Sequence, residues 1–368
     1  MPLLSTIHVD LPVLQPRSYD IVVGRSLVSE MDRAIRAINP VACVIITDTH
    51  LRRTYASSLA RRIRRFVSKT IILSMPHGEG AKNQTTKTAL ERAMLGQRCG
   101  RDTVIVALGG GVVGDVAGFV AATYLRGIPY IQVPTTLLAM VDSSIGGKTG
   151  IDTPEGKNLI GAFWQPSRVI IDVQYLQTLS QPQITSGMME AVKMFITSDP
   201  ASLEIVGRFR KTHRLQDAID FIRRAVTIKA GVIARDETEQ GQRAVLNFGH
   251  TIGHALEQVS GYRIHHGLAV GVGVLVEAKI AQTLGVLPEK EFDKIQEVLA
   301  PWNLPFAVLR RYSSTQIINA TKNDKKVRAG QTRYVLLEKI GKVYVNNGQY
   351  AHPLNDAIVK IAYLACLA

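Results

Sequence analysis

Short apolar runs alternate with amphipathic stretches over the first half of the chain. Apolar runs of this length predict buried strands, and they cover residues 41–47, 67–73, 102–108, 130–133 and 169–173. Residues 51–66 carry apolar positions at helical spacing together with several arginines, which predicts a basic amphipathic helix. Because strands and helices alternate, we expect a parallel sheet. Two further alternating stretches, residues 7–14 and 19–23, predict a strand pair.

The pattern changes after Pro182. Residues 184–300 repeat apolar positions every three or four residues and contain few strand-like runs, which predicts helices. We therefore expect two domains, at residues 1–180 and 181–368, the second mainly helical. Near the C-terminus, residues 334–337 and 343–345 predict a pair of short strands, and residues 357–367 predict an apolar helix.

Composition indicates an ordinary globular protein, with 46% hydrophobic and 20% charged residues among 368. The three cysteines are widely spaced, which favours a reducing compartment, and no signal peptide is evident, so we expect a cytoplasmic protein. The two most apolar windows are interrupted by charges, Asp115 in one and Glu277 in the other, so neither predicts a membrane span. The net charge of +14 is dispersed, and an anionic small substrate explains it more economically than nucleic acid does.

Two glycine-containing segments in the first half favour anion binding. The predicted strand at 102–108 runs directly into Gly109-Gly110-Gly111, and such a strand–helix turn lets backbone N–H groups approach a phosphate. The turn matches neither GxGxxG nor a Walker A loop, and its glycines could also be structural. Residues 142–149 and 156–158 each place a lysine after glycine beyond a strand end, which favours an anion pocket over a capped surface loop.

Four of the nine histidines fall between residues 250 and 266. His250 and His254 are four residues apart, so a helix would place both imidazoles on one face. His265 and His266 follow after a turn, and two helical histidines with a third from the next element are typical of a metal site. A carboxylate at Glu190, on an apolar stretch, would suit a third ligand, although it could equally form a surface pair with Lys193.

Together these segments closely resemble the 3-dehydroquinate synthase family. The most specific matches are residues 108–166 and residues 243–257, RAVLNFGHTIGHALE. The resemblance implies an α/β N-terminal domain with a Rossmann-like parallel sheet that binds NAD, and an all-α C-terminal domain that binds a divalent metal, zinc or cobalt. It also implies a homodimer whose active site lies in the cleft between the domains.

The resemblance also implies the site residues. Metal ligands would be Glu190, His250 and His266. Substrate contacts and catalysis would come from a set rich in cations, namely Asp142, Lys148, Asn158, Lys193, Lys229, Glu239, Arg243, Asn247, His254, Lys325 and Lys326, with Arg126 reaching the neighbouring subunit's substrate. NAD would lie against Asp48, His50, Glu79, Lys82, Gly110, Gly111, Val112, Asp115, Thr135, Thr136, Asp142, Lys148, Lys157 and Thr178.

The implied reaction converts 3-deoxy-D-arabino-heptulosonate 7-phosphate to 3-dehydroquinate and phosphate, a step of the shikimate pathway. A hydroxyl is oxidised by NAD, phosphate is eliminated, the ketone is reduced again and the ring closes by an aldol step. Such a family member is a phosphate-eliminating lyase in which NAD is regenerated in each cycle. His254 is placed to move a proton to or from the hydroxyl that is oxidised.

The chain departs from the family pattern around the predicted metal site. Leu268 stands where glutamate is usual after His-Gly, and His265 stands where an apolar residue is usual, so either histidine of the pair could be the ligand. Met194-Phe195 replaces the common Tyr-Gly. The alternatives are a sugar-phosphate cyclase with another substrate, an NAD- and metal-dependent polyol dehydrogenase, an inactive relative kept for interaction, and, from a different class, a nucleic-acid-binding protein.

Overall fold

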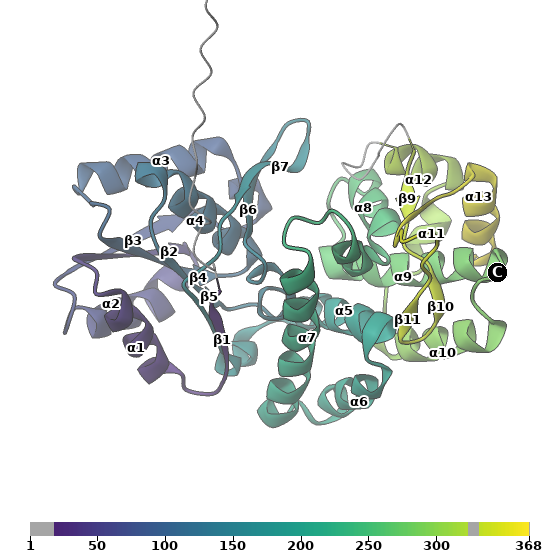
Figure 1. Ribbon diagram of the computed structural model, residues 1–368, viewed down its shortest axis with the longest axis horizontal. Coiled ribbons are helices and arrows are strands. Elements are labelled where there is room, and N and C mark those ends of the chain that lie inside the picture. Colours follow the sequence, from purple (N-terminus) through teal and green to yellow (C-terminus); the bar gives the residue numbers. More distant parts are fainter. Residues whose placement is uncertain (1–17, 323–330, 368) are drawn as a thin grey trace, which may run out of the picture.

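A six-stranded parallel sheet forms the first half of the protein in the computed structural model, which describes residues 18–322 and 331–367 (Figure 1). The strand order is β1-β8-β5-β4-β2-β3. The strands are β1 Asp20–Gly24, β2 Ala42–Asp48, β3 Lys69–Met75, β4 Thr103–Gly109, β5 Tyr130–Pro134 and β8 Arg168–Asp172. The predicted parallel sheet is therefore confirmed. The predicted strand at 19–23 is confirmed as β1, which pairs in parallel with β8. Its predicted partner, residues 7–14, lies outside the described residues, so the strand pair stays a prediction.

Helices cover both faces of this sheet, and alternate residues of each strand supply the two cores. In β2, Cys43 and Ile45 pack toward α1 (Val28–Ile38) and α2 (Ser57–Ile63), whereas Val44 and Ile46 pack toward α3 (Gln84–Gly96) and α4 (Gly111–Thr123). Strands that are buried on both faces have uninterrupted apolar sequences. For this reason the short apolar runs were enough to locate them. The predicted helix at 51–66 is a π-helical turn, Arg52–Ala56, that continues into α2.

The two lysines of the predicted anion pocket, Lys148 and Lys157, lie on an antiparallel hairpin, β6 (Lys148–Thr153) with β7 (Gly156–Phe163). A Cβ at Gly161 would lie 2.0 Å from the carbonyl oxygen of Thr149, so the hairpin needs glycine where strands usually carry branched side chains. A Cβ at Gly118 of α4 would lie 2.4 Å from the Thr149 side chain. The hairpin is therefore packed closely onto α4.

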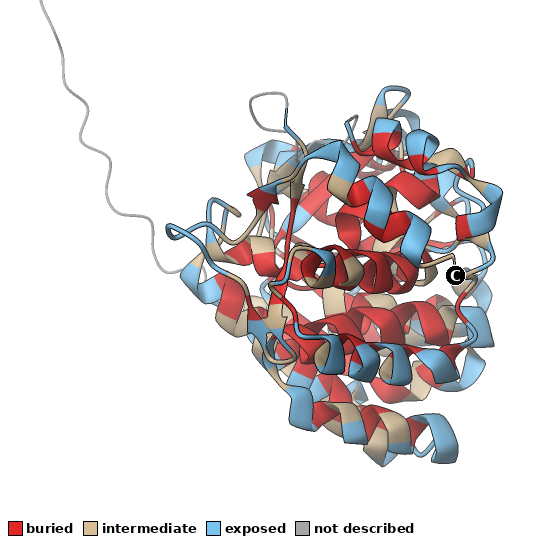
Figure 2. Ribbon diagram, turned by 90° about the vertical axis from the view of Figure 1, so that its right-hand side faces the viewer, coloured by how far each residue is buried: buried red, intermediate tan, exposed pale blue. Residues whose placement is uncertain are grey.

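The second half is mainly helical, as predicted, and Figure 2 shows buried residues toward the inside of its helices and exposed residues toward the outside. The helix α9 (His266–Thr283) is almost entirely buried and packs against α5, α8, α10 and α13 (Figure 1). The other helices are α5 Gln181–Ser198, α6 Leu203–Thr212, α7 Leu215–Arg235, α8 His250–Val259, α10 Glu289–Leu299, α11 Val308–Arg311, α12 Ser314–Thr321 and α13 Asp356–Ala365. A Cβ at Gly273 would lie 2.0 Å from the carbonyl oxygen of Gly249, so glycine lets α9 approach the start of α8.

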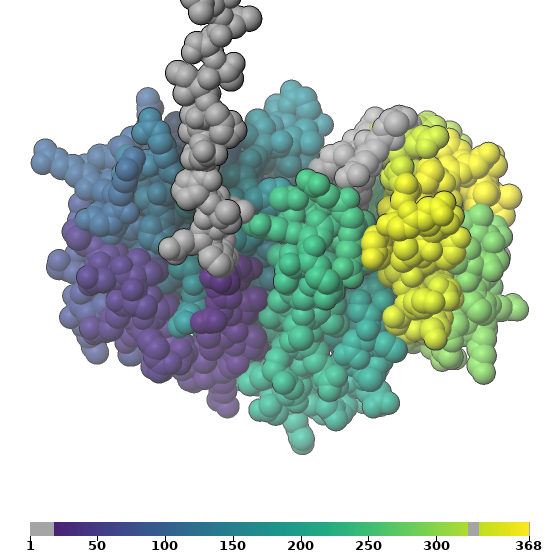
Figure 3. Space-filling view, in the orientation of Figure 1, coloured from purple at the N-terminus to yellow at the C-terminus, as the bar shows by residue number. Residues whose placement is uncertain are grey.

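Short strands at the C-terminal end differ from the expectation. The predicted strand at 334–337 is divided between β9 (Arg333–Tyr334), which pairs with β12 (His352–Pro353), and β10 (Leu337–Lys339), which pairs with β11 (Lys342–Val343). The predicted helix at 357–367 is confirmed as α13. Within residues 18–322 and 331–367, no helix is long and apolar enough to cross a membrane. Figure 3 shows the purple and blue first half beside the green and yellow second half.

Candidate active site

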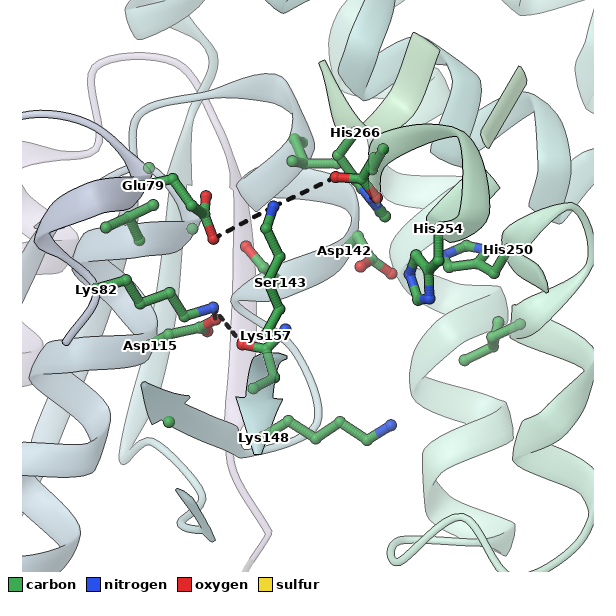
Figure 4. A pocket seen from close by; sticks show the side chains of 18 of the residues that line it. Glu79, Lys82, Asp115, Asp142, Ser143, Lys148, Lys157, His250, His254 and His266 are labelled. Carbon is green, nitrogen blue, oxygen red and sulfur yellow. Dashed lines mark hydrogen bonds and ion pairs between the residues drawn. The ribbon is translucent and has the colours of Figure 1, made fainter. Parts of the chain in front are cut away.

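A cavity of about 1490 Å³ lies where the two halves meet, and side chains from both line it (Figure 4). On the sheet side it opens at the carboxyl ends of the strands, where Asp48 ends β2 and Gly110 follows β4. This edge of a parallel sheet is where α/β proteins commonly bind ligands. The start of α8 and the N-terminus of α9 face it from the helical side.

The glycine turn between β4 and α4 is sterically required. A Cβ at Gly109 would lie 2.6 Å from the Val113 side chain, and one at Gly111 would lie 2.9 Å from Ser143 Oγ. The turn therefore brings the first N–H groups of α4 to the cavity wall, with the helix dipole favouring an anion there. Ser143 Oγ is buried and has no hydrogen-bond partner among the described residues, which leaves a donor for a ligand beside the turn.

Lys82 links α4 to the β6–β7 hairpin beside this turn. Its Nζ lies 2.6 Å from Asp115 Oδ2 on α4 and also donates to Asn158 Oδ1 on β7. Burial opposes the charged ammonium, but the Asp115 and Glu79 carboxylates outweigh it and raise the pKa of Lys82. Lys82 is therefore a charged, buried crosslink between α4 and the hairpin.

A group of cations occupies the middle of the cavity. Lys148 of β6 pairs with Glu239, whose other oxygen accepts from Asn247 Nδ2 at 2.6 Å. Lys229 of α7 pairs with Asp142 and also donates to the Asp142 carbonyl at 2.6 Å. Burial lowers the pKa of Lys229, and Asp142 opposes that shift.

Arg243 and Lys193 complete this group. The Arg243 guanidinium is nearly buried and donates to the carbonyls of Gly146 and Glu237. Lys193 Nζ lies 2.5 Å from Glu190 Oε2, one turn back on α5. The cations come from several different elements, so the cavity suits a ligand that carries more than one negative oxygen.

Glu190 and two imidazoles converge at the helical end of the cavity. Glu190 Oε1 lies 3.6 Å from His250 Nε2 and 3.3 Å from His266 Nε2, and it has no hydrogen-bond partner among the described residues. The His254 ring centroid is 5.3 Å from that of His250 and 5.7 Å from that of His266. One ligand atom from each of the three histidines lies within 4.8 Å of the others, so a cation could also engage His254.

Glu257 contacts the nitrogen of the His266 ring that faces away from Glu190. Its Oε2 lies 2.9 Å from Nδ1 of His266. Burial opposes a charged imidazole, but the Glu190 and Glu257 carboxylates on its two sides outweigh it and raise the pKa of His266 to about 10. The two carboxylates thus favour positive charge at this point, which fits a divalent cation. His265 is exposed and precedes α9, so the geometry favours its neighbour His266 as the ligand.

Glu277 of α9 fixes the start of α8. This fully buried carboxylate accepts from the backbone N–H of Gly249 at 2.8 Å and of Ile252 at 3.1 Å. Gly249 has φ +79°, a left-handed conformation that glycine adopts without strain. Sequence reasoning missed both Glu257 and Glu277 as supporting residues. The signal for Glu277 was a single carboxylate in an otherwise apolar stretch.

The cavity brings together most of the residues expected from the sequence. Those that line it are Asp48, His50, Glu79, Lys82, Gly110, Gly111, Val112, Asp115, Thr135, Thr136, Asp142, Lys148, Lys157, Asn158, Thr178, Lys193, Lys229, Glu239, Arg243, Asn247, His250, His254 and His266. Glu190 lies just behind the surface, fully buried. Arg126 is exposed beyond the end of α4 and is not part of this lining. Lys325 and Lys326 lie outside the described residues.

Comparison with known proteins gives concordant matches for both halves. The family described as "3-dehydroquinate synthase N-terminal" matches residues 72–186, and "3-dehydroquinate synthase C-terminal" matches residues 187–327. A 3-dehydroquinate synthase of Syntrophotalea carbinolica is 41% identical over 90% of this chain and 93% of its own.

Solved structures share the whole architecture at lower identity. The 2-epi-5-epi-valiolone synthase ValA of Streptomyces hygroscopicus subsp. jinggangensis 5008, with NAD⁺ and Zn²⁺ bound, gives a TM-score of 0.86 at 26% identity and covers 98% of this chain and 99% of its own. A 2-deoxy-scyllo-inosose synthase complexed with carbaglucose-6-phosphate, NAD⁺ and Co²⁺ gives 0.82 at 25% identity, over 93% of this chain and 95% of its own.

Proposed function

This chain belongs to the 3-dehydroquinate synthase family, and from that membership we propose that it converts 3-deoxy-D-arabino-heptulosonate 7-phosphate to 3-dehydroquinate and phosphate. The observation that carries the proposal is one cavity in which the glycine turn, the group of cations and the Glu190–His250–His266 cluster meet. The product would enter the shikimate pathway of aromatic amino acid biosynthesis.

The residues present fit a divalent metal. Glu190, His250 and His266 would hold it, and the unpartnered Oε1 of Glu190 faces both Nε2 atoms. A mixed set of one carboxylate and two imidazoles suits zinc or cobalt, the ions in the two solved relatives. When bound, the metal would lower the pKa of a substrate hydroxyl and NAD would accept and return a hydride.

The residues also fit NAD. The pyrophosphate would lie at the N-terminus of α4, where backbone N–H groups and the unpartnered Ser143 Oγ face the cavity. Asp48, at the carboxyl end of β2, is placed for a ribose, as in other sheets of this class. Lys82 and Asp115 would support the turn from below, and the other residues expected to contact NAD line the same cavity.

The chain's own side chains would bind and orient the substrate. Lys148, Lys193 and Arg243 would hold its anionic oxygens, with Lys229 fixed by Asp142. His254 stands beside His250 and His266 and would carry a proton to or from the reacting hydroxyl. Because these groups are held by hydrogen bonds before the substrate arrives, little reorganisation is needed during the reaction.

We further propose a homodimer, two domains divided near residue 180 and a cytoplasmic location. Exposed Leu159 and Ile160 of β7, 48% and 49% accessible, support an interface on the hairpin side. Arg126 is exposed and has φ +68°, a conformation that costs energy in an arginine. A strained, exposed cation outside the cavity fits a residue that reaches the substrate of a second subunit.

The test is phosphate release from a panel of sugar phosphates. We expect release from the heptulosonate phosphate with NAD and a divalent metal present, and no net accumulation of NADH. Release from another heptulose or hexose phosphate alone would assign the chain to a different cyclase activity. Stoichiometric NADH from a polyol would instead indicate a dehydrogenase.

A further inference from the structure

A second cluster of metal-ligating side chains lies at the nucleotide end of the cavity. Asp48 ends β2, His50 follows two residues later, and His77 follows β3. Because β2 and β3 are parallel neighbours with Asp48 paired to Met75, their carboxyl ends bring the three side chains together. Neither His77 nor a metal at this position has a place in the proposed reaction.

The carboxylate of Asp48 is held in one orientation. Its Oδ1 accepts from the backbone N–H of His50 at 2.8 Å and of Leu51 at 3.0 Å. Its Oδ2 lies 3.3 Å from Nδ1 of His77. Asp48 is 8% exposed, whereas both histidines are exposed. A buried, oriented carboxylate therefore lies beside two exposed imidazoles.

The two imidazole rings lie face to face. The centroids of His50 and His77 are 4.0 Å apart with an interplanar angle of 24°. One ligand atom from each of Asp48, His50 and His77 lies within 4.8 Å of the others. Ligand atoms around tetrahedral zinc are about 3.4 Å apart, so small side-chain rotations would bring this set to a metal.

We propose that Asp48, His50 and His77 bind a divalent transition metal of the zinc type, and that this metal and NAD exclude one another. Two imidazoles and a carboxylate form the same ligand set as Glu190, His250 and His266, so both sites favour zinc or cobalt over magnesium or calcium. The three side chains line the same cavity as Gly110, Gly111 and Lys82. The exclusion rests on the proposed function, whereas binding of the metal does not.

Binding is tested on the full-length protein by titrating zinc against a chromophoric chelator. We expect two equivalents in the parent protein and one in His77→Asn. The Glu190→Gln variant should keep the second site and weaken the first. One equivalent in the parent, or two in His77→Asn, would overturn the proposal. Magnesium should bind at neither of the two sites. A bound equivalent of magnesium that is lost in His77→Asn would contradict the zinc-type assignment.

Competition is tested by adding NAD and by kinetics. Saturating NAD should remove the second zinc equivalent from the parent, and excess zinc should inhibit phosphate release in a way that NAD relieves. The zinc concentration for half-inhibition should rise at least about tenfold in His77→Asn, because even outer-shell changes alter metal affinity that much. Basal activity should be unchanged in this variant. A second equivalent that persists under saturating NAD would refute the exclusion, and would do so whether or not the enzyme is a dehydroquinate synthase.

Discussion

Glu257 Oε2 lies 2.9 Å from Nδ1 of His266, on the side of the ring opposite the 3.3 Å approach of Glu190 to Nε2. The carboxylate therefore orients the His266 ring, with Nδ1 toward Glu257 and Nε2 toward Glu190. Glu257 is almost fully buried, and the hydrogen bond from His266 overcomes the effect of burial and lowers its pKa to about 2.

We expect Glu257→Gln to weaken zinc or cobalt binding at the Glu190 site by roughly 10- to 100-fold, because the amide cannot hold the imidazole as a charged carboxylate does. Competition with a chelator would measure the affinity. Glu291→Gln is a control for the same substitution, since the Glu291 carboxylate accepts the backbone N–H of Ile340 and is not among the residues that line the cavity. Equal metal affinity in parent and Glu257→Gln would contradict the role assigned to Glu257.

Removing the metal should abolish turnover. Thorough chelation or His250→Ala should reduce phosphate release at least about 100-fold, because metal stabilisation of developing charge is worth several kcal/mol. Adding back zinc or cobalt should restore the chelated parent but not His250→Ala. Full activity of the chelated protein would reject the metal assignment.

Glu277→Leu should destabilise the fold. The substitution leaves the buried N–H groups of Gly249 and Ile252 without this acceptor, and each such loss costs about 1–3 kcal/mol. We therefore expect a loss of roughly 3 kcal/mol in the free energy of unfolding, measured with urea in the absence of ligands. Glu289→Gln, at the exposed first turn of α10, should change it by less than about 0.5 kcal/mol.

Two glycine-to-alanine substitutions should change the stability of the fold in opposite directions. A Cβ at Gly273 would lie 2.0 Å from the Gly249 carbonyl oxygen, so Gly273→Ala should force α8 and α9 apart and cost about 2–3 kcal/mol. Gly207 lies within α6 with nothing near its Cβ position, so Gly207→Ala should stabilise by about 0.5–1 kcal/mol. Thermal unfolding of both variants would test the pair, and a neutral Gly273→Ala would show that the two helices can separate without cost.

The stability contribution of Asp236 should depend on pH. Its carboxylate accepts backbone N–H groups from Gln240, Gly241 and Arg243, and these lower its pKa against the opposing effect of burial. Because the folded pKa lies below the unfolded value, the contribution is complete above the unfolded pKa of about 3.9 and is lost as pH falls through the folded pKa. Asp236→Asn should therefore be less stable than the parent at pH 7, and the difference should shrink below pH 4. A difference that is constant with pH would show that the carboxylate charge is unimportant.

Sequence reasoning located the features that depend on local pattern. The strands of the sheet have apolar runs because they are buried on both faces. The turn between β4 and α4 is marked in the sequence by three consecutive glycines, Gly109–Gly111. It failed at the β6–β7 hairpin, whose Gly150 and Gly161 are poor strand formers and are required by close backbone approach. Only the close approach of the two hairpin backbones, which no local pattern encodes, explains those glycines.

In the candidate site, too, local sequence predicted some features, and others depend on contacts between distant residues. Spacing placed His250 and His254 on one helix face, but it could not choose between His265 and His266. The choice comes from where α9 begins, because His265 is an exposed residue just before the helix and His266, its first residue, lies 3.3 Å from Glu190. Glu257 and Glu277 act through contacts with residues 9 and 25–28 positions away, and no local pattern encodes those contacts.

Lys157 connects the two ends of the cavity. Its Nζ lies 3.8 Å from Glu79 Oε1 on the nucleotide side and 3.3 Å from Glu257 Oε1 on the metal side (Figure 4). A dinucleotide phosphate that attracts this ammonium would leave Glu257 with less positive charge beside it and strengthen its hold on His266. By thermodynamic reciprocity, metal loading would then change the affinity for NAD by the same factor, and Lys157 would link the two occupancies.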